Sequence, residues 1–309
     1  MGNGYMVVVA GSAIDEYYKT EAFLSSGDCC LAKPMGQKIG GCILNVGAVA
    51  AGLGMDIKVM DYLKKDDADT DTLLNGMKSY RLDTEYIVYG ENVTNCKCLI
   101  MQCGSEKCIY VIEPSRPKYD MSDGKLQKLL NGADYIYGLM HNMHTAFGKE
   151  CTPLKVAKSH GAKIIFDGAS QYNDSAELDT IRLADALVLN DQAYVRLSSR
   201  FSRPAKDVMF SFGTKYVCET LGEKGAYIHT PSKSFFSPSI KVDVIDSTGA
   251  GDTFTAAFIY GISKGWSAEK IVRFASAAGA RACTVYGGFG GAATEQQIIA
   301  FASKNGIKL

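Results

Sequence analysis

The sequence predicts an α/β fold in which helices cover both faces of a mostly parallel sheet, with a small second sheet beside it. Short apolar runs rich in β-branched residues alternate along the chain with amphipathic stretches of helical period. Two segments, 16–34 and 94–112, break this alternation with extended patterns. The glycine-rich run 246–252 is typical of a tight turn that leads into a helix. Regular alternation of strands and helices indicates a parallel sheet that is buried on both faces.

The individual elements follow from hydrophobic period and from turn residues. The predicted strands are 5–10, 56–60, 86–88, 135–138, 163–167, 186–189 and 215–219. The predicted helices are 45–53, 69–80, 125–131, 153–160, 253–264, 268–284 and 295–303. In such a sheet, ligands bind at the carboxyl ends of the strands, so motifs that follow strands are expected to converge there.

The two irregular segments are expected to form one small sheet. Segment 94–112 has the pattern of a hairpin, and segment 16–34 is extended with little helical period. A sheet that projects from an α/β core is suited to act as a lid over a pocket. We therefore expect one core domain, 1–309, with lid insertions at about 16–37 and 92–114. Edge hairpins without a gating role are the alternative.

Composition excludes several classes of protein. The chain has 309 residues, 47% hydrophobic and 21% charged, with a formal net charge of zero. A balanced charge offers no basic field for nucleic acid or for a membrane surface, so neither partner is expected. No apolar run approaches the roughly 20 residues that a membrane span needs. The ten cysteines lack metal-site spacing, so we expect reduced thiols in a cytoplasmic protein.

The most informative stretch is DSTGAGDTF at residues 246–254. Small residues at a helix N-terminus let backbone N–H groups surround an anion, and the helix dipole adds positive potential. Asp252 beside such a site would repel a phosphate. Its presence makes sense if it removes a proton from a hydroxyl as that hydroxyl attacks a phosphoryl group. The alternative is an ordinary Asp that caps a helix.

Further candidate residues stand at predicted turns. Asp15 ends the predicted first strand in AGSAID, where its carboxylate could accept hydrogen bonds from substrate hydroxyls or could cap a turn. A second group lies in IGGCILN and consists of Gly40, Gly41 and Asn45. The third group lies in TLGEKG, which could hold a nucleotide or form a plain hairpin, and consists of Thr220, Gly222 and Gly225. The chain has neither a Walker A motif nor a GxGxxG after the first strand.

The order of these motifs resembles the ribokinase-like (PfkB) family of carbohydrate kinases over essentially the whole chain. The motifs are IGGCILN at 39–45, LVLND at 187–191, TLGEKG at 220–225, DSTGAGDTF at 246–254 and RFASAAGARACTVYGG at 273–288. The resemblance implies a three-layer α/β/α core with a β lid. It also implies transfer of the γ-phosphoryl group of ATP, with Mg²⁺, to a hydroxyl of a small sugar.

The resemblance further implies roles for individual residues. Asp252 is similar to the catalytic base of the family. Thr248, Gly249, Ala250 and Gly251 correspond to its anion hole. Asp15, Gly41 and Asn45 match its sugar contacts, and Asn190 and Ser276 fall at nucleotide contacts. Asp246 and the carbonyl group of Thr248 match a loop that binds a monovalent cation, usually K⁺, in some members.

The chain departs from the family at two positions. The expected Glu of the Asn-x-x-Glu element is Ala193, so Asp191 is the candidate that organises Mg²⁺ through water. Cys42 stands at the position where ribokinase itself looks to have a Lys. A neutral thiol cannot replace that positively charged donor, so ribokinase is not the expected identity. Loss of catalysis, which would leave a sugar-binding or nucleoside-binding protein, is one alternative.

A nucleoside kinase of the same fold is the other alternative. The lid side of the pocket is predicted to be uncharged and rich in sulfur, with Tyr17, Tyr18, Cys96 and Cys98 as candidate liners. Tyrosines near Asp15 could stack on a nucleobase. His141 and His144 are interpreted as surface residues, although they could touch a ligand. Exposed lid strand edges would allow a homodimer.

Overall fold

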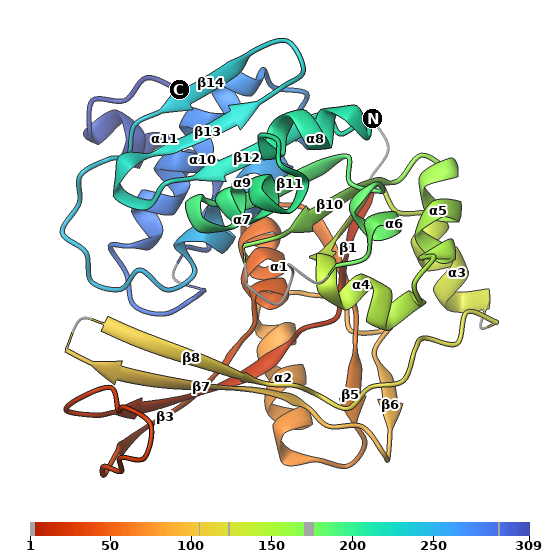
Figure 1. Ribbon diagram of the computed structural model, residues 1–309, viewed down its shortest axis with the longest axis vertical. Helices are drawn as coiled ribbons and strands as arrows, with labels where there is room; N and C mark the ends of the chain where they lie inside the picture. Colours follow the sequence, from red (N-terminus) through yellow and green to blue (C-terminus); the bar gives the residue numbers. More distant parts are fainter. Residues whose placement is uncertain (1–3, 105, 123, 170–175, 290) are drawn as a thin grey trace.

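The computed structural model describes residues 4–104, 106–122, 124–169, 176–289 and 291–309. Its main sheet has eight strands in the order β14-β13-β12-β11-β10-β9-β1-β4 (Figure 1). The strands from β12 to β4 in this order are parallel, whereas β13 and β14 pair antiparallel at one edge. The strands are β1 Tyr5–Val9, β4 Asp56–Met60, β9 Tyr135–Leu139, β10 Lys163–Asp167, β11 Ala186–Asn190, β12 Tyr216–Thr220, β13 Ala226–His229 and β14 Ser234–Ser237.

Strand β1 shows how the sequence divides the interior into two cores. Met6 and Val8 are fully buried in one hydrophobic cluster, and the alternate residues Val7 and Val9 are fully buried in the other. Side chains alternate between the faces of a strand, so a continuous apolar run buries a strand on both sides. The sheet is therefore the middle of three layers, as the sequence predicts.

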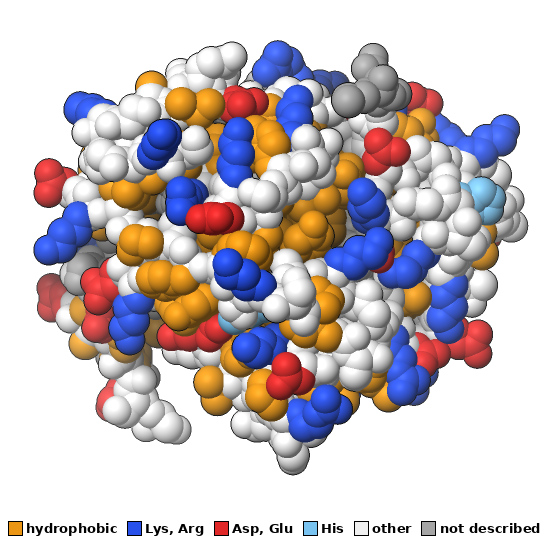
Figure 2. Space-filling model, turned by 90° about the horizontal axis from the view of Figure 1, so that it is seen from above, with side chains coloured by type: hydrophobic (Ala, Val, Ile, Leu, Met, Phe, Trp, Pro, Cys, Tyr) orange, Lys and Arg blue, Asp and Glu red, His pale blue; other side chains and the backbone are white. Residues whose placement is uncertain are grey.

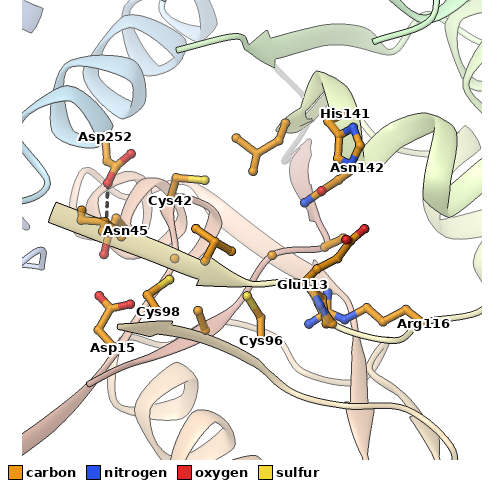
Figure 3. A pocket seen from close by; sticks show the side chains of 18 of the residues that line it. Asp15, Cys42, Asn45, Cys96, Cys98, Glu113, Arg116, His141, Asn142 and Asp252 are labelled. Atoms are coloured by element: carbon orange, nitrogen blue, oxygen red, sulfur yellow. Dashed lines mark hydrogen bonds between the residues drawn. The ribbon is translucent and has the colours of Figure 1, made fainter. Parts of the chain in front are cut away.

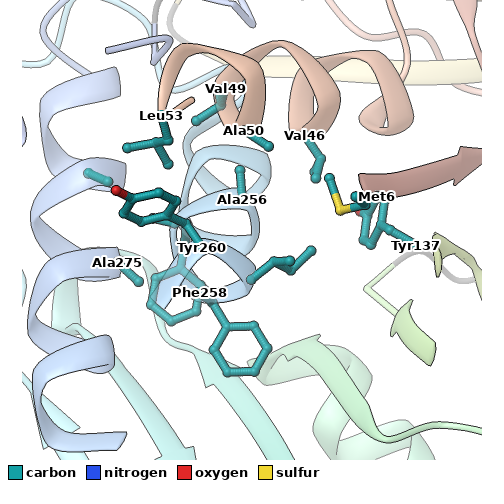
Figure 4. Packing of buried hydrophobic residues seen from close by; sticks show 14 of the residues in the cluster. Met6, Val46, Val49, Ala50, Leu53, Tyr137, Ala256, Phe258, Tyr260 and Ala275 are labelled. Carbon is teal, nitrogen blue, oxygen red and sulfur yellow. The ribbon is translucent and has the colours of Figure 1, made fainter. Parts of the chain in front are cut away.

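Helices cover each face of the sheet. The first core receives side chains from α1, α2, α9, α10 and α11, and Figure 4 shows Val49, Ala256 and Tyr260 meeting in it. The second core receives side chains from the helices between β9 and β12 and from α3. The helices are α1 Cys42–Gly52, α2 Ala68–Ser79, α3 Gly124–Asn131, α4 Met140–Phe147, α5 Thr152–Ser159, α6 Leu178–Ile181, α7 Asp191–Phe201, α8 Ala205–Ser211, α9 Ala250–Ser263, α10 Ala268–Ala282 and α11 Glu295–Lys304.

The two irregular segments pair with each other in a second sheet, which we call the lid sheet. It has four strands in the order β3-β2-β7-β8, and it projects from the core at the lower left of Figure 1. β2 and β7 run parallel, while the two outer pairs are antiparallel. The strands are β2 Ala13–Lys19, β3 Lys33–Gly40, β7 Cys96–Cys103 and β8 Glu106–Ile112.

Several sequence predictions are wrong in detail. Asp15 does not end the first strand, because β1 stops at Val9 and Asp15 lies within β2. The predicted strand 86–88 overlaps only at Val88 with the observed strand β6, Val88–Gly90, which pairs with β5, Tyr62–Lys64, outside the main sheet. Helices α4, α6, α7 and α8 are not among the predicted elements.

The surface away from the lid sheet carries both signs of charge. Figure 2 shows Lys and Arg side chains interspersed with Asp and Glu side chains on this face. This distribution agrees with the formal net charge of zero. Among the described residues, no helix combines the length and the apolar character that crossing a membrane requires.

Candidate active site

A cavity of about 610 Å³ lies between the carboxyl ends of the central strands and the lid sheet. Figure 3 shows its two ends, one with Asp252, Asn45 and Asp15 and the other with polar side chains that follow β8 and β9. The topology explains the location, because the carboxyl ends of parallel strands meet at one edge of a sheet. The residues of the core that line the cavity include Ala10, Gly11, Gly41, Cys42, Asn45, Ser247, Thr248, Gly249 and Asp252.

Asp252 belongs to the first turn of α9, as the sequence predicts. The amide nitrogen Nδ2 of Asn45, on α1, donates a hydrogen bond of 2.5 Å to Asp252 Oδ2. Burial raises the pKa of Asp252 to about 7, and the nearby carboxylates Asp167 and Asp15 also raise it. The hydrogen bond from Asn45 and the charge of Lys107 act in the opposite direction. The site thus holds a carboxyl group that exchanges a proton near neutral pH.

Asp15 faces the same cavity from the lid sheet. It is 9% exposed, and burial raises its pKa to about 6, against the lowering effects of a hydrogen bond with Cys98 and the charge of Lys107. Gly40 packs against this carboxylate so closely that a Cβ atom there would collide with it. The glycine at position 40 therefore makes room for Asp15 and does not line the cavity itself.

Two glycines bring backbone close to the cavity. Gly41 is the N-cap of α1 with φ of 89°, and a Cβ atom there would collide with the carbonyl oxygen of Gly11. Gly249 is the N-cap of α9 with φ of 77°, and a Cβ atom there would collide with the carbonyl oxygen of Gly288. Both positions need a left-handed backbone conformation that glycine adopts without strain.

Asp246 holds the loop before α9. Its two carboxylate oxygens accept hydrogen bonds from the backbone N–H groups of Thr248, at 2.9 Å, and of Gly287, at 3.0 Å. Burial opposes ionisation of Asp246, but these hydrogen bonds outweigh burial and lower its pKa. Asp246 therefore fixes Thr248, Gly249 and the start of α9 against the segment after α10.

The prediction of an uncharged lid is wrong. Lys107 of β8 lines the cavity, and its Nζ atom donates a 2.7 Å hydrogen bond to Thr248 Oγ1 of the core. Cys96 and Cys98 line the cavity as predicted, whereas Tyr17 and Tyr18 are not among its lining residues. A nucleobase in this cavity would not stack on those two tyrosines.

Asn190, Thr220, Gly222, Gly225 and Ser276, which were predicted to contact the nucleotide, are not among the residues that line this cavity. Asn190 and Thr220 are register partners at the carboxyl ends of β11 and β12. Asn190 caps α7, because its Oδ1 atom accepts the N–H of Ala193 at 2.8 Å. Ser276, on α10, is 9% exposed, and its hydroxyl has no hydrogen-bond partner among the described residues.

The TLGEKG segment is a hairpin connection between β12 and β13, not a strand-to-helix turn. Gly222 and Gly225 adopt φ values of 57° and 115°. A Cβ atom at Gly225 would collide with the carbonyl oxygen of Ser237, so that glycine is required by the packing of the hairpin. The segment therefore forms the plain hairpin that the sequence analysis gave as the alternative.

Comparison with known proteins identifies the family. The sequence pattern of the pfkB family of carbohydrate kinases matches residues 5–294. The chain belongs to the pfkB family of carbohydrate kinases. This match confirms the resemblance seen in the motifs and the expected class of activity, ATP-dependent phosphorylation of a sugar.

Curated relatives and solved structures agree with the family. The sequence is 25% identical over 245 residues to the ATP-dependent ribose-1-phosphate kinase of Halopiger xanaduensis, covering 79% of this chain and 80% of that enzyme. It is 24% identical over 270 residues to the ribokinase of Staphylococcus aureus, and the match covers 84% of this chain and 86% of that enzyme. The structure of Arabidopsis thaliana ribokinase complexed with ribose and ATP superposes with a TM-score of 0.83 at 22% identity. The match covers 96% of this chain and 98% of that one. The last comparison confirms the predicted fold.

A preformed metal cluster is not a feature of the described part of this pfkB kinase. Within that part, no group of three or more His, Cys, Asp or Glu side chains is arranged to hold a metal ion. Asp191 is exposed and accepts a 2.8 Å hydrogen bond from the N–H of Gln192. Asp167, at the end of β10, is 7% exposed, and burial raises its pKa. Mg²⁺ usually binds through one or two carboxylates, water and substrate phosphates, so a metal that arrives with ATP would not need a preformed cluster.

Sequence reasoning missed the residues at the other end of the cavity. His141, which was interpreted as a surface residue, lines the cavity together with Asn142 and Thr145 on α4. Arg116 and Glu113 line it from the segment after β8. The position of HNMH directly after a strand was the one available signal for α4, because ligands collect at such strand ends. Nothing in the sequence around Arg116 indicates a site.

Proposed function

We propose that Asp252 is the general base that removes the proton from the acceptor hydroxyl of a small sugar. One observation carries this proposal: a half-buried carboxyl group with a pKa raised to about 7 faces the cavity at the start of a helix. A general base is most effective when its pKa lies near the working pH. The hydrogen bond from Asn45 fixes the direction in which Asp252 presents its second oxygen.

The turn before α9 is the proposed anion hole for the γ-phosphoryl group. Residues 248–251 supply backbone N–H groups at the N-terminus of a 14-residue helix, where the helix dipole favours negative charge. Lys107 adds a positive charge beside Thr248. Charge that develops on the transferred phosphoryl oxygens would be stabilised by these groups, which are already oriented before reaction.

ATP and Mg²⁺ are the proposed cofactors, and K⁺ is a further proposal. Mg²⁺ would supply charge neutralisation on the phosphates, with Asp167 and Asp191 as the carboxylates that could hold its water ligands. Asn190, Thr220, Gly222, Gly225 and Ser276 are proposed to face the nucleotide. The loop of Asp246 and the carbonyl group of Thr248 is the proposed place for K⁺, which activity with and without KCl would test.

Asp15, Gly41 and Asn45 are proposed to bind the acceptor. Asp15 and Asn45 are 9% and 6% exposed, so their polar atoms need a partner such as a substrate hydroxyl. Gly41 allows the backbone to approach the ligand, and Gly40 makes space for Asp15. A nucleoside kinase stays the second candidate, because a cavity of about 610 Å³ is large enough for a base as well as a sugar.

Two further expectations stay predictions. Residues Ile109 to Ile112 of the outer strand β8 are about half exposed, which would suit a homodimer formed through the lid sheet. Analytical ultracentrifugation would test the dimer. A cytoplasmic location is expected from an ATP-consuming reaction and from ten free cysteines.

The replacement Asp252→Asn tests the proposed base. We expect turnover to fall by roughly 10²–10⁴-fold while sugar and ATP still bind, because only the proton acceptor is lost. Coupled ADP release measures turnover, and calorimetry measures binding. Asp71→Asn, on the exposed side of α2, is the matched control and should behave as the wild type. Turnover near the wild-type value in Asp252→Asn would remove Asp252 from this role.

A further inference from the structure

Arg116 is an unusual residue of the cavity wall, because its side chain is only 9% exposed. Its Nη1 atom donates a 2.7 Å hydrogen bond to Asp61 Oδ1. Asp61 is buried, and it also accepts the N–H of Tyr62 on Oδ1 and the N–H and hydroxyl of Ser12 on Oδ2. Asp61 thus holds the guanidinium group at one corner, and its oxygens are already engaged by other donors.

The rest of the guanidinium group is unused. Arg116 Nε and Nη2 are buried, and neither has a hydrogen-bond partner among the described residues. These two nitrogens form the side edge of the guanidinium plane, where two N–H bonds point in parallel. That edge matches the spacing of two oxygens of a carboxylate or phosphate group. Buried donors of a charged group that lack partners are costly, so a ligand that engages both is favoured.

The neighbouring side chains complete a polar end of the cavity. Figure 3 shows Arg116, Asn142 and His141 together, at the end away from Asp252 and Asp15. Asn142 adds amide hydrogens that can donate to the same anion. Glu113 also lines this end, but it is exposed to solvent, so water screens its charge. The cavity therefore has carboxylates at one end and a buried cation at the other.

We propose that the acceptor substrate is a phosphorylated sugar, whose ester phosphate binds to the free edge of Arg116. This inference rests on the proposed function of Asp252. A hydroxyl group at the other end of the sugar loses its proton to Asp252, and its oxygen forms a bond to the γ-phosphorus of ATP. The bond from that phosphorus to the β–γ bridging oxygen breaks, and ADP leaves. The product is a sugar that carries two phosphates, and the original ester is unchanged.

Substrate preference is the first test. We would measure kcat/KM for ribose 1-phosphate, ribose 5-phosphate and fructose 6-phosphate, and for ribose, fructose, adenosine and cytidine. We expect one phosphorylated sugar to exceed its unphosphorylated counterpart by roughly 100-fold or more, since an Arg–phosphate pair is among the strongest polar contacts. Equal or better activity with a free sugar or a nucleoside would overturn the inference.

Arg116→Lys tests the residue itself. Lysine keeps the positive charge beside Asp61, which protects folding, but it lacks the paired donors of guanidinium. We expect kcat/KM for the phosphorylated sugar to fall by about 10–100-fold, mainly through KM, and to fall by much less for the neutral sugar, which has no phosphate to bind. Arg273→Lys, in an exposed pair with Glu269, is the matched control and should change neither value. An equal loss for both acceptors would show a structural role and overturn the inference.

Binding separates this inference from the proposed base. Calorimetry of ribose 5-phosphate and of ribose would use Asp252→Asn with and without Arg116→Lys. Tighter binding of the phosphate ester that disappears with Arg116→Lys supports the subsite, whatever the role of Asp252. Equal affinity for both sugars overturns it. If free sugars are phosphorylated and Asp252→Asn abolishes that activity, the proposed function stands without the anion subsite.

Discussion

Three carboxylates set the chemistry at the scale of single residues. Asp252, Asp15 and Asp167 come from α9, β2 and β10, and each has a pKa above its usual value, with burial as the largest cause. Asp167 and Asp15 also raise the pKa of Asp252, because nearby negative charges oppose its ionisation. Asn45 and Lys107 counteract this at Asp252. The balance leaves Asp252 with a pKa of about 7, where a base can both accept and release a proton.

This balance predicts a pH profile. A base must be ionised to act, so kcat/KM should rise with pH and level off above an apparent pKa of about 7. Asn45 donates to the ionised form of Asp252 and lowers its pKa. The replacement Asn45→Ala should therefore move the rising limb to higher pH, which steady-state kinetics between pH 5 and 9 would measure.

The matched control for this shift is Asn142→Ala. Asn142 lines the same cavity, but it lies at the opposite end from Asp252 (Figure 3). The replacement Asn142→Ala should alter the affinity for the acceptor, but it should leave the rising part of the pH profile of kcat/KM at the same pH. A limb that stays in place in Asn45→Ala would mean that another group controls the profile.

The first turn of α9 shows how an element builds the site. Gly249 is in the left-handed region, and its missing side chain lets the turn pack on Gly288. Gly251 stands two residues later, within the helix, and a Cβ atom there would meet open space. The same glycine-rich motif therefore contains one glycine that the backbone requires and one that it does not.

Alanine replacements separate these two glycines. Gly249→Ala should lower the free energy of unfolding by about 1–2 kcal/mol from the left-handed backbone alone, and by more through the collision with Gly288. Gly251→Ala, its control, should be neutral or raise that free energy by about 0.5–1 kcal/mol, because alanine favours a helix. Urea unfolding at fixed pH measures both. Equal losses at both positions would contradict the assigned geometry.

The lid sheet and the core meet around the cavity at the scale of the whole molecule. Lys107 is the point on β8 where the lid bonds to the loop before α9, through Thr248. Its charge lowers the pKa of Asp252, of Asp15 and of Asp246. One residue of the lid sheet thus contacts the proposed anion hole and lowers the pKa of the proposed base.

Removal of the positive charge of Lys107 should impair catalysis. We expect Lys107→Met to lower kcat by about tenfold or more, because a charge beside the transferred phosphoryl group is lost. We also expect it to move the rising limb of the pH profile upward. Lys97→Met, in the neighbouring strand β7, is the control, since Lys97 pairs with Glu16 and Asp69 and does not line the cavity. Similar effects of both replacements would indicate a general loss of lid stability instead.

The sequence by itself determined the layered α/β fold, the second sheet and one end of the site. Local signals sufficed there, because strand and helix periods, paired glycines and the 246–252 turn depend on residues that are neighbours in the chain. These signals made Asp252, Asn45 and Asp15 candidates, and the resemblance to the pfkB family implied their roles. Details that depend on strand pairing were not determined, so Asp15 was assigned to the wrong strand, and the sequence left open whether TLGEKG forms a hairpin.

Only the tertiary structure decided what faces the base across the cavity. Arg116, His141 and Lys107 come from the segment after β8, from α4 and from the lid, and no spacing in the sequence relates them. Their roles depend on where the lid sheet packs and on which donors Asp61 already holds. Burial and contacts with distant segments determine the protonation state of a side chain and which of its hydrogen-bonding groups have no partner. Burial and such contacts arise only when segments far apart in the sequence meet.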